Sequence, residues 1–182
     1  LSWLWLRGRC RRCKGAISPR YPAIELAMGL LAVAIWNRWK IYPAWGGLAI
    51  AAAAVLLAIA VIDWDTFLIP DELSLGLLAV GLVIAPVNPF FSSATWYFSV
   101  LKSFAGGVIG LLICWGTAAL GEKIFKKEAM GGGDIKLLAA VGAWTGGLGA
   151  FDCLIVASFL GSIYGVALMM IGKLGRSEPM PF

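Results

Sequence analysis

Residues 41–62 contain no charged side chain, and this run limits what the chain can fold into more than any other feature. About 20 consecutive apolar residues are enough to span the hydrocarbon layer of a membrane as a helix. The whole chain agrees with this, because 60% of its 182 residues are hydrophobic and only 14% are charged. Soluble domains carry about 25% charged residues. The sequence therefore predicts an all-α, polytopic membrane helix bundle.

Apolar segments bounded by charged residues, glycine or proline predict about six transmembrane helices in this chain. They cover residues 21–36, 44–62, 73–85, 104–120, 135–147 and 153–172, with Asp152 in the turn between the last two. We expect three parts: a cytoplasmic basic and cysteine-bearing segment at 1–20, a transmembrane domain at 21–175 and the start of a further C-terminal segment at 176–182.

Small residues recur at intervals of four in the last three predicted helices. The pairs are Gly106 with Gly110, Gly142 with Gly146, and Gly161 with Gly165. Such spacing lets the backbones of membrane helices approach closely. We therefore expect these helices to pack tightly, and we assign the glycines no chemistry.

Lysine and arginine are distributed unequally between the two sides of the predicted membrane. Twelve lie in the N-terminal segment, around residues 123–136 and in the tail, whereas the other loops hold three: Arg38, Lys40 and Lys102. Basic residues favour the cytoplasmic side of a membrane. The N-terminus, residues 63–72 and residues 131–134 are therefore predicted to share the cytoplasmic face. The net charge of +5 reflects this topology, and no nucleic-acid partner is expected.

Two carboxylates stand at predicted helix ends on that face. Gly131, Gly132 and Gly133 immediately precede Asp134, and Asp63 follows the uncharged run. Glycine lets another backbone approach closely, and carboxylates at a membrane edge are rare and usually functional. As a pair, one ionised carboxylate can activate water while its protonated partner polarises a peptide carbonyl. The chain contains no histidine, which excludes imidazole chemistry.

Other interpretations of these acids stay open. Asp63 and Asp134 can be solvated boundary charges or helix caps, and interfacial carboxylates also occur in secondary transporters and channel-like proteins. Asp65, Asp71 and Glu72 are further candidates for one member of the pair. Asp71 follows Pro70 at what looks like a helix start, which favours a capping role for it.

Three segments of the chain resemble the type IV prepilin peptidase family, whose members are membrane aspartic proteases with a Gly-x-Gly-Asp motif. They are Met130-Gly131-Gly132-Gly133-Asp134-Ile135-Lys136-Leu137-Leu138, Asp63 with Ile69-Pro70-Asp71, and Arg9-Cys10-Arg11-Arg12-Cys13 followed by Ile17-Ser18-Pro19-Arg20-Tyr21-Pro22 and Glu25. The likeness covers essentially the whole chain, in order. It implies about eight membrane helices in a full-length protein.

The resemblance implies a multi-pass enzyme of the bacterial inner membrane that removes the basic leader of type IV prepilins and pseudopilins at the cytoplasmic face. It implies Asp63 and Asp134 as the catalytic pair and no cofactor for proteolysis. We expect the three glycines to let the substrate backbone approach Asp134.

Many members of the family also methylate the new amino terminus with S-adenosylmethionine, and these carry two Cys-x-x-Cys pairs that look like a zinc site. Cys10 and Cys13 form one such pair, so they are expected to be half of a zinc site, and methylation is expected only of a full-length protein. Cys114 and Cys153 lie in apolar segments and are expected to serve packing.

Overall fold

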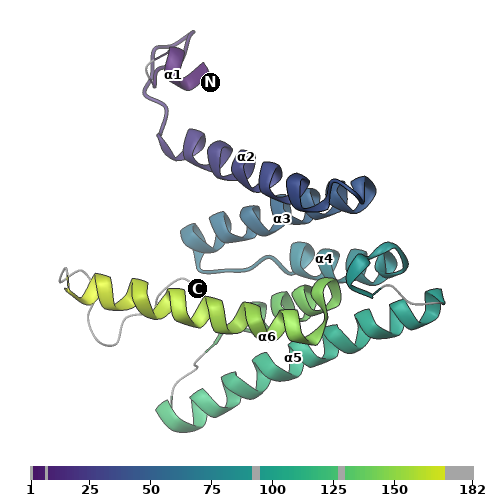
Figure 1. Cartoon of the computed structure of the whole chain (residues 1–182). Coiled ribbons are helices and arrows are strands. Elements are labelled where there is room, and N and C mark those ends of the chain that lie inside the picture. Colours follow the sequence, from purple (N-terminus) through teal and green to yellow (C-terminus); the bar gives the residue numbers. More distant parts are fainter. Residues whose placement is uncertain (1, 7, 92–94, 127–129, 171–182) are drawn as a thin grey trace. The chain divides into compact units, whose positions relative to one another are not determined.

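The computed structural model consists of α-helices joined by turns (Figure 1). It describes residues 2–6, 8–91, 95–126 and 130–170, so the predicted segment 176–182 lies outside the described residues. Within these ranges there is no strand, only an isolated bridge between Arg9 and Ala16. The all-α prediction is confirmed. Contacts divide the chain into two compact units, Leu1–Leu57 and Ala58–Phe182, and the predicted boundary after residue 20 stays a prediction.

The first unit contains the short helix α1 (Ser2–Trp5), a turn that carries the first two cysteines, and α2 (Arg20–Trp39). Arg20 N–H donates a hydrogen bond to the Ser18 hydroxyl at 3.3 Å, where α2 begins. α2 has no buried residue, and apolar side chains such as Leu26 and Leu30 are more than 60% exposed. A helix that presents leucines outward along its length suits a lipid environment.

The second unit contains the end of α3 (Pro43–Thr66), α4 (Asp71–Val83), the 3-10 helices η1 (Ala85–Val87) and η2 (Pro89–Phe91), α5 (Trp96–Phe125) and α6 (Gly132–Met170). The predicted helices correspond to these in order, but their bounds differ, most of all those of α5 and the end of α3. α5 extends beyond the predicted residues 104–120 at both ends. α3 continues through Asp63 and Asp65, which were placed after it, because charged side chains do not stop a helix. The reversal comes at Phe67, whose φ is 55°.

α5 and α6 pack through glycines, as predicted. A Cβ atom on Gly106 would overlap the carbonyl oxygen of Gly142, and one on Gly110 would lie 2.5 Å from the carbonyl oxygen of Leu138. The backbones of the two helices are therefore in direct contact, which only residues without a side chain permit.

α6 is broken at Gly146, where φ is 82° and ψ is 173°. Leu138 before the break and Ala150 after it both lie against Gly110, since a Cβ atom there would be 3.3 Å from the Ala150 Cβ. In a straight helix those two residues would be about 18 Å apart. The chain therefore folds back, and α6 has two arms (Figure 1). Two helices were predicted here, but Asp152 lies within the second arm, because the backbone at Gly146 sets the reversal.

Buried hydrogen bonds hold α4 and α5 on the first arm of α6. Trp144 Nε1–H donates to the Leu77 carbonyl at 2.8 Å, and the Ser103 hydroxyl donates to the Ala143 carbonyl at 2.7 Å. Asn88, which is 1% exposed, donates from Nδ2 to the Trp144 carbonyl at 2.8 Å. Buried polar groups are costly unless they are paired in this way. These bonds fix the helices whose other ends carry the candidate site.

Among the described residues, three helical segments are long and apolar enough to cross a membrane. They are Pro43–Thr66, Trp96–Ile124 and Gly132–Ala167. Large apolar side chains stand outward along them, for example Leu112 at 54% and Phe159 at 65% exposed. The chain is a membrane protein, and the prediction of about six transmembrane helices stays a prediction.

Candidate active site

Asp63 lies in the last turn of α3 and is 9% exposed. Its carbonyl oxygen accepts a hydrogen bond from Phe67 N–H at 2.8 Å, which closes the end of the helix. The neighbouring Trp64 packs against Tyr164 on the second arm of α6, with 5.9 Å between ring centroids. The end of α3 is therefore held against α6, and its carboxylate is largely shielded from solvent.

Asp134 is the third residue of α6. Its Oδ2 atom accepts a hydrogen bond from Gly131 N–H at 3.1 Å, and its own N–H donates to the Gly131 carbonyl at 3.2 Å. This is the acidic half of a capping box, in which the third helical residue reaches back to the residue before the helix. The capping role considered from the sequence is therefore present, and it leaves the carboxyl group at the open end of the helix.

The two aspartates belong to the same compact unit, with Asp63 in the last turn of α3 and Asp134 in the first turn of α6. The sequence places them on different helices, and the fold brings the end of α3 to the start of α6. Two carboxyl groups that lie side by side can share one proton, which is the arrangement needed to activate water and polarise a carbonyl together. Their catalytic role is taken up as a proposal below.

The three glycines before Asp134 have different surroundings. A Cβ atom on Gly133 would lie 2.8 Å from the Cβ of Ile69, and one on Gly131 would lie 3.2 Å from Asp134 Oδ2. A Cβ atom on Gly132 would meet nothing within 4 Å. Gly133 therefore makes room for the chain's own loop, and Gly132 is the glycine with open space beside it.

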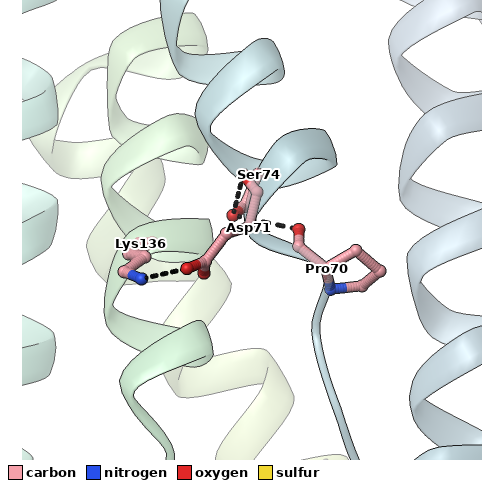
Figure 2. A network of polar contacts seen from close by, with 4 residues as sticks. All are labelled: Pro70, Asp71, Ser74 and Lys136. Carbon is pink, nitrogen blue, oxygen red and sulfur yellow. Dashed lines mark hydrogen bonds and ion pairs between the residues drawn. The ribbon is translucent and has the colours of Figure 1, made fainter.

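Asp71 is the first residue of α4, and among the described residues the hydrogen-bond partner of its carboxylate is Lys136 and not the backbone of the helix start. The predicted capping role was therefore wrong. Asp71 Oδ2 instead forms an ion pair with Lys136 Nζ at 2.6 Å, which joins the start of α4 to the first arm of α6 (Figure 2). The Ser74 hydroxyl stabilises this helix start by donating to the carbonyl oxygens of Pro70 and Asp71. Sequence reasoning did not identify Lys136 as a partner.

The two cysteines of the apolar segments differ. Cys114 is fully buried and packs with Leu138 and Ala150, and its Sγ lies 3.4 Å from Met130 Sδ. The packing role predicted for Cys114 is confirmed. Cys153 is exposed on the second arm of α6, so the packing role predicted for it was wrong. A membrane helix exposes apolar residues to lipid, so apolar neighbours in the sequence do not show whether a cysteine is buried within the protein.

Cys10 and Cys13 lie in a tight turn of the first unit. Cys10 N–H donates to the Gly15 carbonyl and Lys14 N–H donates to the Cys10 carbonyl, both at 2.9 Å. Hydrogen bonds from the backbone of Cys13 and Arg12 lower the pKa of the Cys10 thiol. A thiolate stabilised in this way is suited to bind a metal.

A structural zinc ion takes four ligands, and Cys10 and Cys13 supply two. Within the described ranges no three His, Cys, Asp or Glu residues are grouped so that they could hold a metal ion. The turn therefore fits one half of a tetrahedral thiolate site.

Comparison with known proteins agrees with this geometry. A profile of the type IV leader peptidase family matches residues 50–166, and a profile of the bacterial peptidase A24 N-terminal domain matches residues 1–39. The chain belongs to the type IV leader peptidase family. The first matched region contains both aspartates, and the second contains both N-terminal cysteines.

Curated relatives of the family are similar along the whole chain. The chain is 40% identical to a prepilin leader peptidase/N-methyltransferase of Aeromonas salmonicida (strain A449) over 183 residues, covering 100% of this chain and 60% of that protein. Proteins of the same description are 40% identical in Aeromonas hydrophila, and 38% in Stutzerimonas stutzeri, again over 100% of this chain and 60% of each relative. The chain thus spans about 60% of the length of these relatives. No solved structure matches it significantly.

Proposed function

We propose that this chain carries the catalytic part of a membrane aspartic endopeptidase that removes the basic leader of type IV prepilins and pseudopilins. The observation that supports this most directly is that the segment after Asp63 packs on the start of α6, where Ile69 lies against Gly133, the residue before Asp134. Membership of the leader peptidase family and the descriptions of its relatives as prepilin leader peptidases support the same substrate class.

In the proposed reaction the two carboxyl groups share one proton. The ionised carboxylate takes a proton from water as the water attacks the scissile carbonyl carbon, and the protonated carboxyl donates a hydrogen bond to the carbonyl oxygen. The resulting tetrahedral intermediate collapses when the leaving amine accepts a proton, which releases the leader and a new amino terminus. The Gly131 amide holds Asp134 at the start of α6 throughout.

The surroundings of the two aspartates support a prepilin as the substrate. A prepilin is a basic leader joined to a long apolar helix, and the apolar outer surfaces of α3, α5 and α6 suit such a helix within the bilayer. The junction would then reach the helix ends that carry the two aspartates. Gly132 has open space beside it, so an extended peptide can approach the backbone there.

We propose a bacterial inner-membrane location with the active site on the cytoplasmic face. The bias of twelve basic residues to three supports this orientation. It also agrees with a substrate whose basic leader stays in the cytoplasm.

Methylation is a proposal for the longer protein. The relatives are described as N-methyltransferases as well as peptidases, and S-adenosylmethionine is the expected methyl donor. In this proposal Cys10 and Cys13 supply two of the four thiolates of a zinc site, and a second Cys-x-x-Cys pair supplies the others. When bound, the zinc would stabilise the fold of the cysteine segment, and proteolysis would need no metal.

Leader removal by the purified protein in proteoliposomes tests the proposed function. The wild type should shorten a prepilin by its leader, whereas Asp63→Asn and Asp134→Asn should not. Asp152→Asn is a matched control, because it removes an exposed carboxylate from the same helix as Asp134. A transporter that uses interfacial carboxylates would leave the prepilin intact in every case, and that result would refute the peptidase assignment.

A further inference from the structure

We propose that Lys136 and Asp71 are positioning residues that hold the start of α6, and with it Asp134, in register with the segment that leads from Asp63 to α4. This inference rests on the proposed function and assigns a role to residues outside the catalytic pair. We call the contacts between these two segments the clamp. It consists of Ile69 and Asp71 on one side and Gly133 and Lys136 on the other.

The polar contact of the clamp is the ion pair in Figure 2. Lys136 Nζ and Asp71 Oδ2 are 2.6 Å apart, the distance of a charge-assisted hydrogen bond. Asp71 is well anchored, because the buried Ser74 donates its hydroxyl to the Pro70 and Asp71 carbonyls and its N–H to the Pro70 carbonyl. The backbone that carries the Asp71 carboxylate is therefore held at the start of α4.

The apolar contact lies one turn earlier on α6. Gly133 lies against Ile69 so closely that a Cβ atom on the glycine would be 2.8 Å from the Ile69 Cβ. Residues three apart share one face of a helix, so Gly133 and Lys136 both turn the same face of α6 toward the residues 69–71. Two contacts one turn apart fix the rotation of α6 about its axis as well as its position.

Asp134 lies between Gly133 and Lys136 in sequence. Successive residues of an α-helix are rotated by about 100° about the helix axis, so the Asp134 side chain leaves α6 in a different direction from the face that meets residues 69–71. Its carboxylate accepts a hydrogen bond from Gly131 N–H at 3.1 Å. The clamp thus controls the direction in which Asp134 points, although no described hydrogen bond joins Lys136 or Asp71 to either aspartate of the pair.

The exposure of the ion pair argues for positioning over stability. The side chains of Lys136 and Asp71 are 41% and 54% exposed, and exposed ion pairs contribute little to folding. Catalysis is more sensitive, because a displacement of about 1 Å can lower a rate about 10²-fold. Loss of the pair should therefore change turnover much more than folding.

The first test is a double-mutant cycle on prepilin cleavage in proteoliposomes. Lys136→Gln and Asp71→Asn should each lower kcat about tenfold and leave KM within about twofold, and the double variant should be no worse than either single one. Lys136→Arg, which keeps the charge and can reach Asp71, should retain most of the activity. Glu72→Gln is the matched control, because it removes the adjacent charge from the first turn of α4 and spares the pair. Wild-type turnover in the single variants, or independent losses that multiply in the double, would overturn the proposal.

The second test does not depend on the substrate. Hydrogen exchange in detergent should accelerate in residues 67–74 and 131–138 together when Lys136→Gln breaks the pair. Exchange in α5 should not change in this variant, and the Glu72→Gln variant should exchange as the wild type does. Unchanged exchange in both segments would refute the clamp even if cleavage fell. If the wild type cleaved no prepilin, the proposed function would fail, and the exchange comparison would still decide whether the clamp exists.

Discussion

Ile69 occupies the space that a side chain on Gly133 would need, because the Ile69 Cβ lies 2.8 Å from the position of a Cβ atom on that glycine. The residue directly before Asp134 is therefore glycine because Ile69 of the same chain leaves no space for a side chain there. Gly132 differs, since a Cβ atom there would meet nothing within 4 Å.

This difference predicts that substitutions of the two neighbouring glycines impair cleavage in different ways. Gly133→Ala should lower cleavage about tenfold or more, because two Cβ atoms cannot approach so closely and α6 must shift against residues 69–71. Adding Ile69→Gly, which removes the opposing Cβ atom, should restore much of the loss. Kinetics of prepilin cleavage by the wild type, the single variant and the double variant provide the measurement, and Gly133→Ala with full activity would contradict the structural account.

Gly132→Ala tests whether the open glycine serves the substrate. The substitution should leave folding unchanged, because alanine is favoured over glycine in a helix. If the peptide backbone passes here, KM should rise several-fold while kcat changes by less than about twofold. An unchanged KM would remove Gly132 from the substrate path.

Asp63→Asn and Asp134→Asn should each lower cleavage by about three orders of magnitude or more, and the double variant should be scarcely worse than either, because residues that act as one unit are non-additive. Asp65→Asn and Asp71→Asn should have milder effects. Initial rates normalised to the amount of folded protein provide the comparison. A severe loss in Asp65→Asn with a silent Asp63→Asn would move the catalytic partner two residues along α3.

Gly142→Ala should separate α5 from α6. A Cβ atom on Gly142 would overlap the carbonyl oxygen of Gly106, and overpacking of this kind costs about 1–3 kcal/mol. Gly116→Ala is the matched control on α5, since nothing lies within 4 Å of a Cβ atom there. Thermal unfolding in detergent should show a lower Tm for Gly142→Ala alone, and equal midpoints would argue against direct backbone contact.

The Cys10 thiol predicts a pH dependence of its chemical reactivity. Hydrogen bonds from the backbone of Cys13 and Arg12 lower its pKa, so the reactive thiolate should persist to lower pH than in an ordinary cysteine. Alkylation of the chelator-treated protein, followed across pH by mass spectrometry, measures the midpoint, and trypsin separates Cys10 from Cys13 at Arg11 and Arg12. A midpoint at or above the ordinary value would contradict the hydrogen bonding described.

Membrane orientation is tested by cysteine labelling. Thr66→Cys and Glu122→Cys should react only from the cytoplasmic side and Val87→Cys only from the other, because the basic residues favour that orientation. Val87 and Glu122 lie before and near the end of α5, respectively. Labelling of positions 66 and 122 from opposite sides would exclude the proposed topology.

Local patterns in the sequence predicted the helices well because charge-free runs, prolines and glycine spacing act over a few residues. The close packing of α5 on α6 was predicted from such spacing, and the structure shows it where Gly106 meets Gly142. The pair of Lys136 with Asp71 was not, because the two are 65 positions apart and neither residue indicates its partner locally. The reversal in α6 was placed near Asp152 instead of at Gly146, since a left-handed glycine and a glycine in a packed face look alike in sequence.

The fold-back at Gly146 has a consequence for the lipid around the site. The first arm of α6, residues 132–145, is about 20 Å long, as is the 13-residue α4. The hydrocarbon layer of a bilayer is about 30 Å thick, and local thinning of the bilayer is one way in which such a mismatch is accommodated. Asp134 at the start of this arm would then lie in a shallow depression of the membrane surface, where hydrolytic water arrives directly from bulk solvent and no channel through the protein is needed.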